Sequence, residues 1–314
     1  MEIIRGIENL KRPLVNPVVT LGNFDGVHLG HQKIFKRVME EASRLHGEGI
    51  VITFEPHPLK VLAPEKFLPL LTPFRKKMMF IEASGIRTVL CLEFSLGFSE
   101  LSASEFIKNI LLDRVKARKV IIGFNYHFGK KQEGDAHMLI HTGQTYGFDV
   151  EVVEALKIGQ ITVSSSKIRD LLQKGEVEGA SKLLGRDYPV IGKVIKGVGR
   201  GRSLGFPTAN LERSDELYPG TGVYAVEVVW KGQHLEGLAN IGWNPTFAPE
   251  ETENKRTFSL EVHIMHFNQN IYGEEIQVNF KKRIRDEIRF NSSRHLIDQI
   301  RKDIRWANEN VFHH

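Results

Sequence analysis

The sequence predicts an α/β chain in two parts: a parallel sheet with helices on both faces, then an antiparallel β-barrel with a C-terminal helix. Up to about residue 184, short apolar runs alternate with amphipathic helical patterns, the order that produces a parallel sheet covered by helices. From about residue 187, runs rich in Val, Ile, Tyr and Phe are separated by Gly, Pro and Asn turns, which is typical of antiparallel sheets.

The first part has the alternation of a Rossmann-like domain. Its expected strands are 18–22, 50–54, 87–92, 119–123 and 149–153. Its expected helices are 31–46, 73–83, 103–113, 134–146, 165–173 and 176–184. In such sheets, ligands bind beyond the carboxyl ends of the strands.

The second part is expected to form a barrel from the segments 189–196, 222–231, 234–242, 257–265 and 275–281. A final helix, capped by Ser292 or Ser293, would cover it with one apolar stripe. That stripe consists of Leu296, Ile297, Ile300, Ile304 and Ala307. We therefore expect domains at 1–184 and 185–314.

Length and composition favour a folded chain in a reducing compartment. The 314 residues suggest about two domains of ~150 residues each. No apolar run approaches the ~18 residues that span a bilayer, and the first residues lack the apolar centre of a signal peptide. The single cysteine, Cys91, has no internal partner for a disulfide. We expect a cytoplasmic protein that does not bind a membrane.

The charge balance suits small anionic substrates. The formal net charge is +5 and the pI is about 9.1, but the basic residues are dispersed. The densest group, Lys281-Lys282-Arg283 with Arg285 and Arg289, has no interleaved aromatic residues for stacking bases. We therefore expect nucleotides rather than nucleic acid as partners.

The stretch 22–31, GNFDGVHLGH, is the most informative motif. It joins an apolar strand to a helix, and its glycines, Gly22, Gly26 and Gly30, allow close approach of the backbone to an anion. His28 and His31 form the HxGH signature of nucleotidyltransferases, which attack the α-phosphate of a nucleoside triphosphate and release pyrophosphate. No GK[ST] follows, so this is not a Walker A loop. The alternative is a helix entry whose histidines only pack.

Two further motifs follow strands of the first part. Thr53-Phe54-Glu55-Pro56-His57-Pro58 predicts a rigid loop, in which Phe54 and His57 would line a flat aromatic substrate; a stiff connector is the alternative. In the segment 123–129, GFNYHFG, Asn125 offers a donor and an acceptor beside aromatic side chains. This second motif suggests a pocket wall.

The segment 164–169, SSSKIR, opens a helix with basic residues in its first turn. Serine caps helices well, but Lys167 and Arg169 are unfavourable beside a helix N-terminus unless an anion is present. A conflict between a local rule and the sequence is expected at functional sites. We therefore expect this helix to bind an anion.

In the second part, a basic, glycine-rich run over 192–205 ends in Leu204-Gly205-Phe206-Pro207-Thr208-Ala209-Asn210. Such loops can fold over phosphates, although many are simple turns. Thr208 and Asn210 supply neutral oxygens suited to Mg²⁺. Glu261 lies in the middle of a strand, on the same face as Ser259 and His263; a carboxylate that only faces solvent is its alternative.

In these motifs and their order, the chain resembles the bacterial bifunctional riboflavin kinase/FMN adenylyltransferases, also called FAD synthetases, over nearly its whole length. The motifs are GNFDGVHLGH, TFEPHP, GFNYHFG, SSSKIR, GRGRSLGFPTANL, GVYAV, NIGWNPTF, LEVHI and IYGEEI. Each is moderately specific, whereas their joint order is highly specific. The run Gly129-Lys130-Lys131-Gln132-Glu133-Gly134 departs slightly from the usual glycine and basic run.

The resemblance implies roles for residues of both parts. His28, His31, Asn125, Arg169 and Glu261 would be catalytic, with Glu261 as base for the riboflavin 5′-hydroxyl. The implied nucleotide-binding residues are Gly22, Asn23, Phe24, Gly26, His28, His31, Ser164, Ser165, Arg169, Gly199, Thr208 and Asn210. The implied flavin-binding residues are Phe54, Pro56, His57, Pro58, Asn125 and Phe128. Thr208 and Asn210 would organise Mg²⁺ with ATP.

The resemblance also implies two reactions, riboflavin plus ATP to FMN and ADP, then FMN plus ATP to FAD and pyrophosphate. Mg²⁺ is the expected cofactor, ATP the co-substrate, and assembly into a homo-oligomer is left open. One rival is a single-activity adenylyltransferase with a regulatory barrel; the intact Thr208, Asn210 and Glu261 argue against it. Another is a flavin- or RNA-binding regulator, against which His28, His31 and Arg169 argue.

Overall fold

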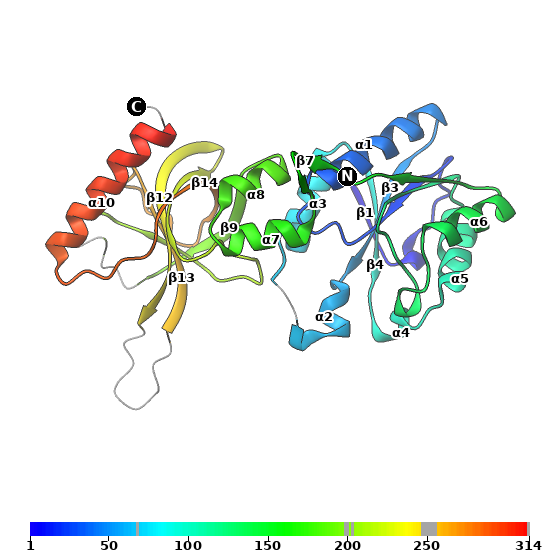
Figure 1. The fold of residues 1–314 in the computed structure, drawn as a ribbon, viewed down its shortest axis with the longest axis horizontal. Coiled ribbons are helices and arrows are strands. Elements are labelled where there is room, and N and C mark those ends of the chain that lie inside the picture. Colours follow the sequence, from blue (N-terminus) through cyan, green and yellow to red (C-terminus); the bar gives the residue numbers. More distant parts are fainter. Residues whose placement is uncertain (67–68, 198–200, 202–203, 246–255, 313–314) are drawn as a thin grey trace. The chain divides into compact units, whose positions relative to one another are not determined.

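The computed structural model describes residues 1–66, 69–197, 201, 204–245 and 256–312 (Figure 1). The chain separates into two compact units, Met1–Ser165 and Ser166–His314. The first contains a parallel six-stranded sheet and the second a closed six-stranded antiparallel barrel. Both parts of the predicted fold class are confirmed.

The sheet of the first unit has the order β1-β4-β3-β2-β5-β6, with every neighbouring pair parallel. Its strands are β1 (Glu2–Arg5), β2 (Val18–Leu21), β3 (Gly49–Glu55), β4 (Thr88–Glu93), β5 (Lys119–Gly123) and β6 (Asp149–Val153). The chain order reverses between β2 and β5, and ligands bind at such a switch point. Of the strands in this sheet, β1 was not predicted; it is an edge strand of four residues in which Ile4 alone is buried.

Helices cover both faces of this sheet, as predicted. Val18 joins a core formed with side chains of α1 (Leu29–Arg44) and α3 (Phe74–Ala83). Its neighbour Val19 joins the opposite core, with side chains of α5 (Ala103–Phe106), η3 (Ile107–Val115) and α6 (Ala136–Tyr146). This alternation follows from the period of two along a strand.

Helix boundaries differ from the prediction where side chains cap them. Helix α1 begins at Leu29 rather than residue 31, because the His28 ring accepts a hydrogen bond from the backbone N–H of His31. Helix α5 begins with a capping box of Ser102 and Glu105 and continues into the π-helix η3, where a single α-helix was expected.

The remaining elements of the first unit are short. They are η1 (Ile7–Asn9), α2 (Pro58–Leu62), η2 (Pro64–Lys66), α4 (Leu96–Ser99), η4 (Lys130–Gln132) and the hairpin of β7 (Lys157–Ile158) and β8 (Ile161–Thr162). In the described part of the chain, no helix combines the length and apolar character needed to cross a bilayer.

The second unit contains the barrel β10-β13-β12-β11-β14-β9, which closes because β9 also pairs with β10. The strands are β9 (Tyr188–Ile195), β10 (Ala209–Leu211), β11 (Gly222–Trp230), β12 (Gln233–Pro245), β13 (Arg256–Ile264) and β14 (Glu275–Arg285). Strand β10, which lies within the glycine-rich motif, was not predicted. Helices α7 (Ser165–Gln173) and α8 (Val177–Leu184) precede the barrel along the chain.

The C-terminal helix α10 (Ser293–Ala307) lies against the barrel (Figure 1), and so does the short π-helix η5 (Asn308–Phe312) that continues it. Ser292 caps α10 by accepting from the N–H of His295, as expected. Ala307 packs with Ala225 and Leu238 of the barrel. The buried Asp303 accepts hydrogen bonds from Arg285 of β14, with Nη2 2.8 Å from Oδ2. This ion pair holds the helix to the barrel, in addition to the contacts made by the apolar stripe.

Candidate functional site

The turn between β2 and α1 has an unusual backbone. Phe24 and Val27 have φ angles of 49° and 41°, and Gly26 between them has 86°. Non-glycine residues seldom adopt the left-handed region, so the surroundings must hold this turn in place. The turn starts at Gly22, whose N–H donates to Ile52 O of the neighbouring strand at 3.1 Å.

Asp25 anchors the turn to the segment before α3. Its Oδ1 accepts from the N–H and the hydroxyl of Thr72 at 2.9 and 3.1 Å, and its Oδ2 accepts from the N–H of Leu71 at 3.1 Å. The Thr72 hydroxyl also accepts from the N–H of Gly26 at 2.9 Å. This buried, fully hydrogen-bonded carboxylate compensates the strain of the backbone.

His28 and His31 lie together at the N-terminus of α1. Their rings are stacked with centroids 3.6 Å apart and an interplanar angle of 18°. Because His28 Nδ1 accepts from the N–H of His31 at 3.3 Å, the ring proton of neutral His28 is on Nε2. Gly30 allows this arrangement, since a Cβ there would lie 3.1 Å from the His28 ring. Phe24 supports His31 with an edge-on ring contact at 5.2 Å.

This N-terminus suits an anion, because a first helical turn directs backbone N–H groups and the positive end of the helix dipole outward.

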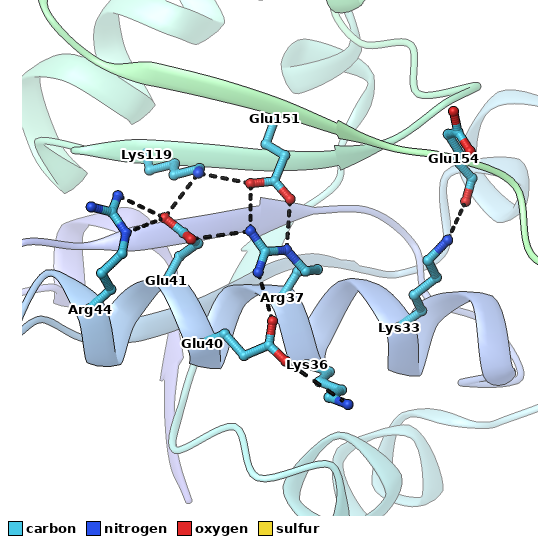
Figure 2. Close-up of polar contacts among 9 residues, drawn as sticks. All are labelled: Lys33, Lys36, Arg37, Glu40, Glu41, Arg44, Lys119, Glu151 and Glu154. Atoms are coloured by element: carbon cyan, nitrogen blue, oxygen red, sulfur yellow. Dashed lines mark hydrogen bonds and ion pairs between the residues drawn. The ribbon is translucent and has the colours of Figure 1, made fainter.

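An ion network holds the body of α1 to β5 and β6 (Figure 2). Arg37 Nε lies 2.8 Å from Glu151 Oε1, and Lys119 Nζ lies 3.0 Å from Glu41 Oε2. Hydrogen bonds from Arg44 and Lys119 lower the pKa of Glu41 to about 2, so this anchor remains charged.

Asn125 follows β5, the strand beside β2 at the switch point. A Cβ on Gly123 would lie 3.5 Å from Ile34 Cδ1 of α1 and 3.8 Å from Asn125 Oδ1. The predicted motifs after β2 and β5 therefore lie on neighbouring strands. The side chain of Asn125 is exposed, and the backbone carbonyl oxygen of this residue lies 3.1 Å from His127 Nδ1.

The aromatic residues expected to bind flavin belong to a cluster in the core. Phe54 lies 5.9 Å from Phe94, and Phe128 lies 5.7 Å from Tyr126, between ring centroids. Phe54 and Phe128 are 8% and 7% exposed. Little of either side chain is therefore accessible to a substrate.

The segment after β3 contains the short helix α2. His57 caps the short helix α2, because its Nδ1 accepts from the N–H of Leu59 at 3.2 Å. Pro58 is the first residue of that helix, and its fixed φ suits this position. Pro56 and Pro58 flank His57, and their fixed φ angles restrict the backbone of this segment.

Ser165, the last residue of the first unit, lies beside the same turn. The Ser165 hydroxyl donates to the carbonyl oxygen of Asp25 at 2.8 Å, and the carbonyl oxygen of Val163 lies near Gly30. Ser164 immediately precedes the helix. Within α7, Lys167 forms an ion pair with Asp170 at 3.0 Å. The charge of Lys167, one of the two basic residues in this segment, is therefore balanced within the helix and does not by itself indicate a bound anion. Arg169 is half-buried.

A second group of polar residues lies in the barrel. The Thr208 hydroxyl donates to Glu261 Oε2 at 3.4 Å. Asn210 of β10 and Asn240 of β12 both pair with Glu261 of β13 across the sheet. Asn210, Glu261 and Asn240 therefore form a row across three neighbouring strands.

The predicted alternation along β13 is confirmed. Leu260 and Val262 are buried, whereas Glu261 and His263 are half-buried. His263 Nδ1 lies 2.9 Å from the carbonyl oxygen of Pro207. Burial lowers the pKa of His263, although that hydrogen bond opposes the effect. The neutral ring thus donates to the segment that carries Thr208.

Gly199, a predicted nucleotide-binding residue, lies outside the described residues. Three residues that hold the turn were not predicted, namely Asp25, Thr72 and the buried Lys77. A signal existed for Lys77, because it occupies the apolar stripe of α3 with Phe74, Met78 and Ile81. A lysine at such a position needs buried acceptors.

Comparison with known proteins finds two families, which match successive parts of the chain. Residues 11–167 match the model of the FAD synthetase family, and residues 184–311 match that of the riboflavin kinase family. The bifunctional riboflavin kinase/FMN adenylyltransferase of Buchnera aphidicola subsp. Schizaphis graminum is 40% identical over 306 residues, 97% of each chain. The enzyme of that name from Escherichia coli K12 is 37% identical over 311 residues, which cover 98% of this chain and 97% of the relative.

A solved structure agrees with the fold over the whole chain. The crystal structure of a protein described as a macrolide-efflux protein from Streptococcus pneumoniae has a TM-score of 0.87 and 31% identity. The match covers 99% of both chains. The fold described here is therefore similar to that of a relative whose structure has been determined by crystallography.

Proposed function

Because the chain belongs to the family of bifunctional riboflavin kinase/FMN adenylyltransferases, we propose that the two polar groups described above carry out its two reactions. The enzyme phosphorylates riboflavin with ATP to give FMN, then adenylylates FMN with a second ATP to give FAD and pyrophosphate. We assign adenylylation to the residues around α1 and phosphorylation to those around Glu261. The single observation that carries the first assignment is the stacked pair His28 and His31 at the switch point.

The adenylylation needs no nucleophile from the protein. An oxygen of the FMN phosphate, already ionised at neutral pH, attacks the α-phosphorus of ATP, and the bond to the departing pyrophosphate breaks. Catalysis then consists of alignment and of neutralising negative charge as it develops. His28 Nε2–H, His31 and the first N–H groups of α1 are donors suited to that charge.

Other residues of the first group would orient the substrates. Ser164, Ser165 and Arg169 would bind phosphate at the start of α7, and Asn125 would bind near the reacting groups. Gly22, Asn23, Phe24 and Gly26 would shape the nucleotide-binding turn. Pro56, His57 and Pro58, with the edges of Phe54 and Phe128, would border the flavin. The position of these segments after neighbouring strands supports the assignment.

Phosphorylation of riboflavin requires removal of a proton from an alcohol. We assign that step to Glu261. Its carboxylate would accept the proton of the riboflavin 5′-hydroxyl while the 5′-oxygen attacks the γ-phosphorus of ATP and ADP departs. Gly199 would contribute to nucleotide binding in the same reaction. The row of Asn210 and Asn240 beside Glu261 would orient the carboxylate.

The residues beside Glu261 fit Mg²⁺. Thr208 directs its proton to Glu261, which leaves lone pairs of its oxygen for a hard cation, and Asn210 adds an amide oxygen. Bound Mg²⁺ would neutralise charge on the phosphates. Thr208 and Asn210 would hold it.

We extend the proposal to the organisation of the chain. Residues 1–184 would support adenylylation and residues 185–314 phosphorylation, with α7 and α8 contributing to the first activity although they cluster with the second unit. A cytoplasmic location is supported by the buried thiol of Cys91, the chain's only cysteine. The partners would be small molecules, namely riboflavin, FMN, FAD, ATP, ADP and pyrophosphate.

A time course with riboflavin, ATP and Mg²⁺ tests the proposal, with flavins separated by chromatography. FMN should appear first and FAD after it. A variant lacking the His28 imidazole should stop at FMN, whereas Glu261→Gln should make FAD only from supplied FMN. If His28→Ala produced FAD at the wild-type rate, the assignment of the adenylylation site would be wrong.

A further inference from the structure

Lys77 of α3 is a buried cation beneath the nucleotide-binding turn. Its side chain reaches the ends of two strands, and the residue is 5% exposed. Its Nζ donates to the carbonyl oxygen of Asn23 at 3.3 Å, to the hydroxyl of Thr53 at 3.2 Å and to the carbonyl oxygen of Phe54 at 3.4 Å. These acceptors lie in the turn after β2 and at the end of β3, so one ammonium group joins both segments.

The charge of Lys77 is not neutralised by a direct partner. Its three protons go to neutral oxygens, and none of the described carboxylates forms an ion pair with it. Burial lowers the pKa of Lys77, while the more distant charges of Glu55 and Asp25 oppose that shift. A buried cation is costly unless it is compensated. An anion bound at the turn above it would supply that compensation.

The segment that carries Lys77 makes several of the contacts that hold the turn. Asp25 is held by Leu71 and Thr72, and Asn23 is held by Lys77, so residues 71–77 hold the turn at two points. The Thr53 hydroxyl, fully buried, adds a bond to Asn23 O at 3.4 Å. A shift of the Asn23 carbonyl would therefore move the start of the turn that precedes His28.

We propose that Lys77 is a positioning residue for adenylyl transfer, which fixes the turn through Asn23 and attracts the nucleotide phosphates by its buried charge. The proposal rests on the proposed function of the first unit. Lys77 lies behind the turn and need not touch the substrate. It should therefore influence binding and alignment of ATP in FAD formation and leave FMN formation unchanged.

The test compares Lys77→Met with Lys77→Arg. Lys77→Met keeps most of the side-chain volume and removes the charge and all three hydrogen bonds. We expect kcat/KM for ATP in FAD formation to fall about 10²-fold, the loss that small misplacement at an active site can cause. Lys77→Arg, which keeps the charge, should recover at least part of that loss. Formation of FMN by the same chains should remain at the wild-type rate.

Met78→Ala provides the matched control for stability. Met78 is adjacent on α3 and buried in the core, but it makes none of the bonds to Asn23, Thr53 or Phe54. Its truncation should lower the urea midpoint and leave kcat/KM for ATP nearly unchanged. If Met78→Ala reduced kcat/KM as much as Lys77→Met, Lys77 would act through stability alone and the inference would fail.

Thr53→Val gives a milder test should Lys77→Met fail to fold. Valine matches the shape of threonine and removes one acceptor of Lys77, whereas Thr53→Ser retains the hydroxyl. We expect an increase in KM for ATP with valine and near wild-type behaviour with serine. Unchanged FAD formation in both Lys77→Met and Thr53→Val would overturn the inference. If His28→Ala still abolished FAD formation, the proposed function would stand; if it did not, that assignment would fail as well.

Discussion

The rings of His28 and His31 are stacked with centroids 3.6 Å apart, so both imidazoles face one region at the start of α1. His28 has two roles there, since Nδ1 caps the helix and Nε2–H is the proposed donor to a ligand. These roles can be separated experimentally, because asparagine is also a good cap.

His28→Ala should lower the rate of FAD formation about 10²–10³-fold, roughly 3 kcal/mol, through loss of a donor to developing charge. It should also destabilise the first unit by about 1 kcal/mol through loss of the cap. His28→Asn should lose the activity but retain the stability. Chromatography of flavins and urea unfolding would check both. Equal losses of stability in the two variants would exclude the capping role.

Glu261→Gln should block phosphorylation of riboflavin and leave adenylylation of supplied FMN unchanged, because an amide cannot accept the proton of the hydroxyl. The expected fall in the kinase rate is at least about 10²-fold. Glu275→Gln on the exposed side of β14 is the control and should retain both activities. Wild-type kinase activity in Glu261→Gln would remove this residue from the role of base.

Asp25→Asn should weaken the turn without changing its size. The amide has one acceptor oxygen, whereas the carboxylate accepts from Leu71 and Thr72 on both of its oxygens. The amide NH₂ would face a backbone donor, at a cost of about 1–3 kcal/mol. We expect a lower urea midpoint and a higher KM for ATP in FAD formation. An unaltered KM would show that the turn keeps its shape without this anchor.

Glu41→Gln should make the first unit less stable at neutral pH, by about 1–2 kcal/mol, because it breaks a partly buried ion network. The folded-state pKa of Glu41 is about 2, below its ordinary value of 4.5. Its stabilising contribution is therefore complete above pH ~4.5 and disappears as the pH falls towards ~2. Urea midpoints of the two proteins should converge over that range. A constant difference down to pH ~2 would contradict the assignment.

Much of the fold was predictable because the hydrophobic period differs between its two parts. The strands β2 to β6 and the barrel strands β9, β11, β12, β13 and β14 were expected at nearly their observed positions. The edge strand β1 was missed, since four residues with charged ends show almost no period. The π-helix η3 has the same apolar residues as an α-helix, and periodicity alone did not distinguish them.

The chemistry-bearing residues were predictable where their spacing along the chain is short. His28 and His31 are three residues apart, and the structure places them together. The clamp of Asp25 by Thr72 joins residues 47 positions apart, and no local pattern indicates such a pair. The neighbours of Glu261 likewise depend on the register in which the barrel strands pair, and a local sequence pattern does not determine that register.

The closed barrel also has a consequence for association with other chains. Each of its strands has a hydrogen-bonded neighbour on both sides in the described part of the chain, so the folded second unit offers no open edge to an extended peptide. The sheet of the first unit ends at β1 and β6, where backbone groups on the outer side are not paired within the sheet. Within the six-stranded sheet, cross-chain β pairing, including the early steps of aggregation, should therefore begin at these two strands.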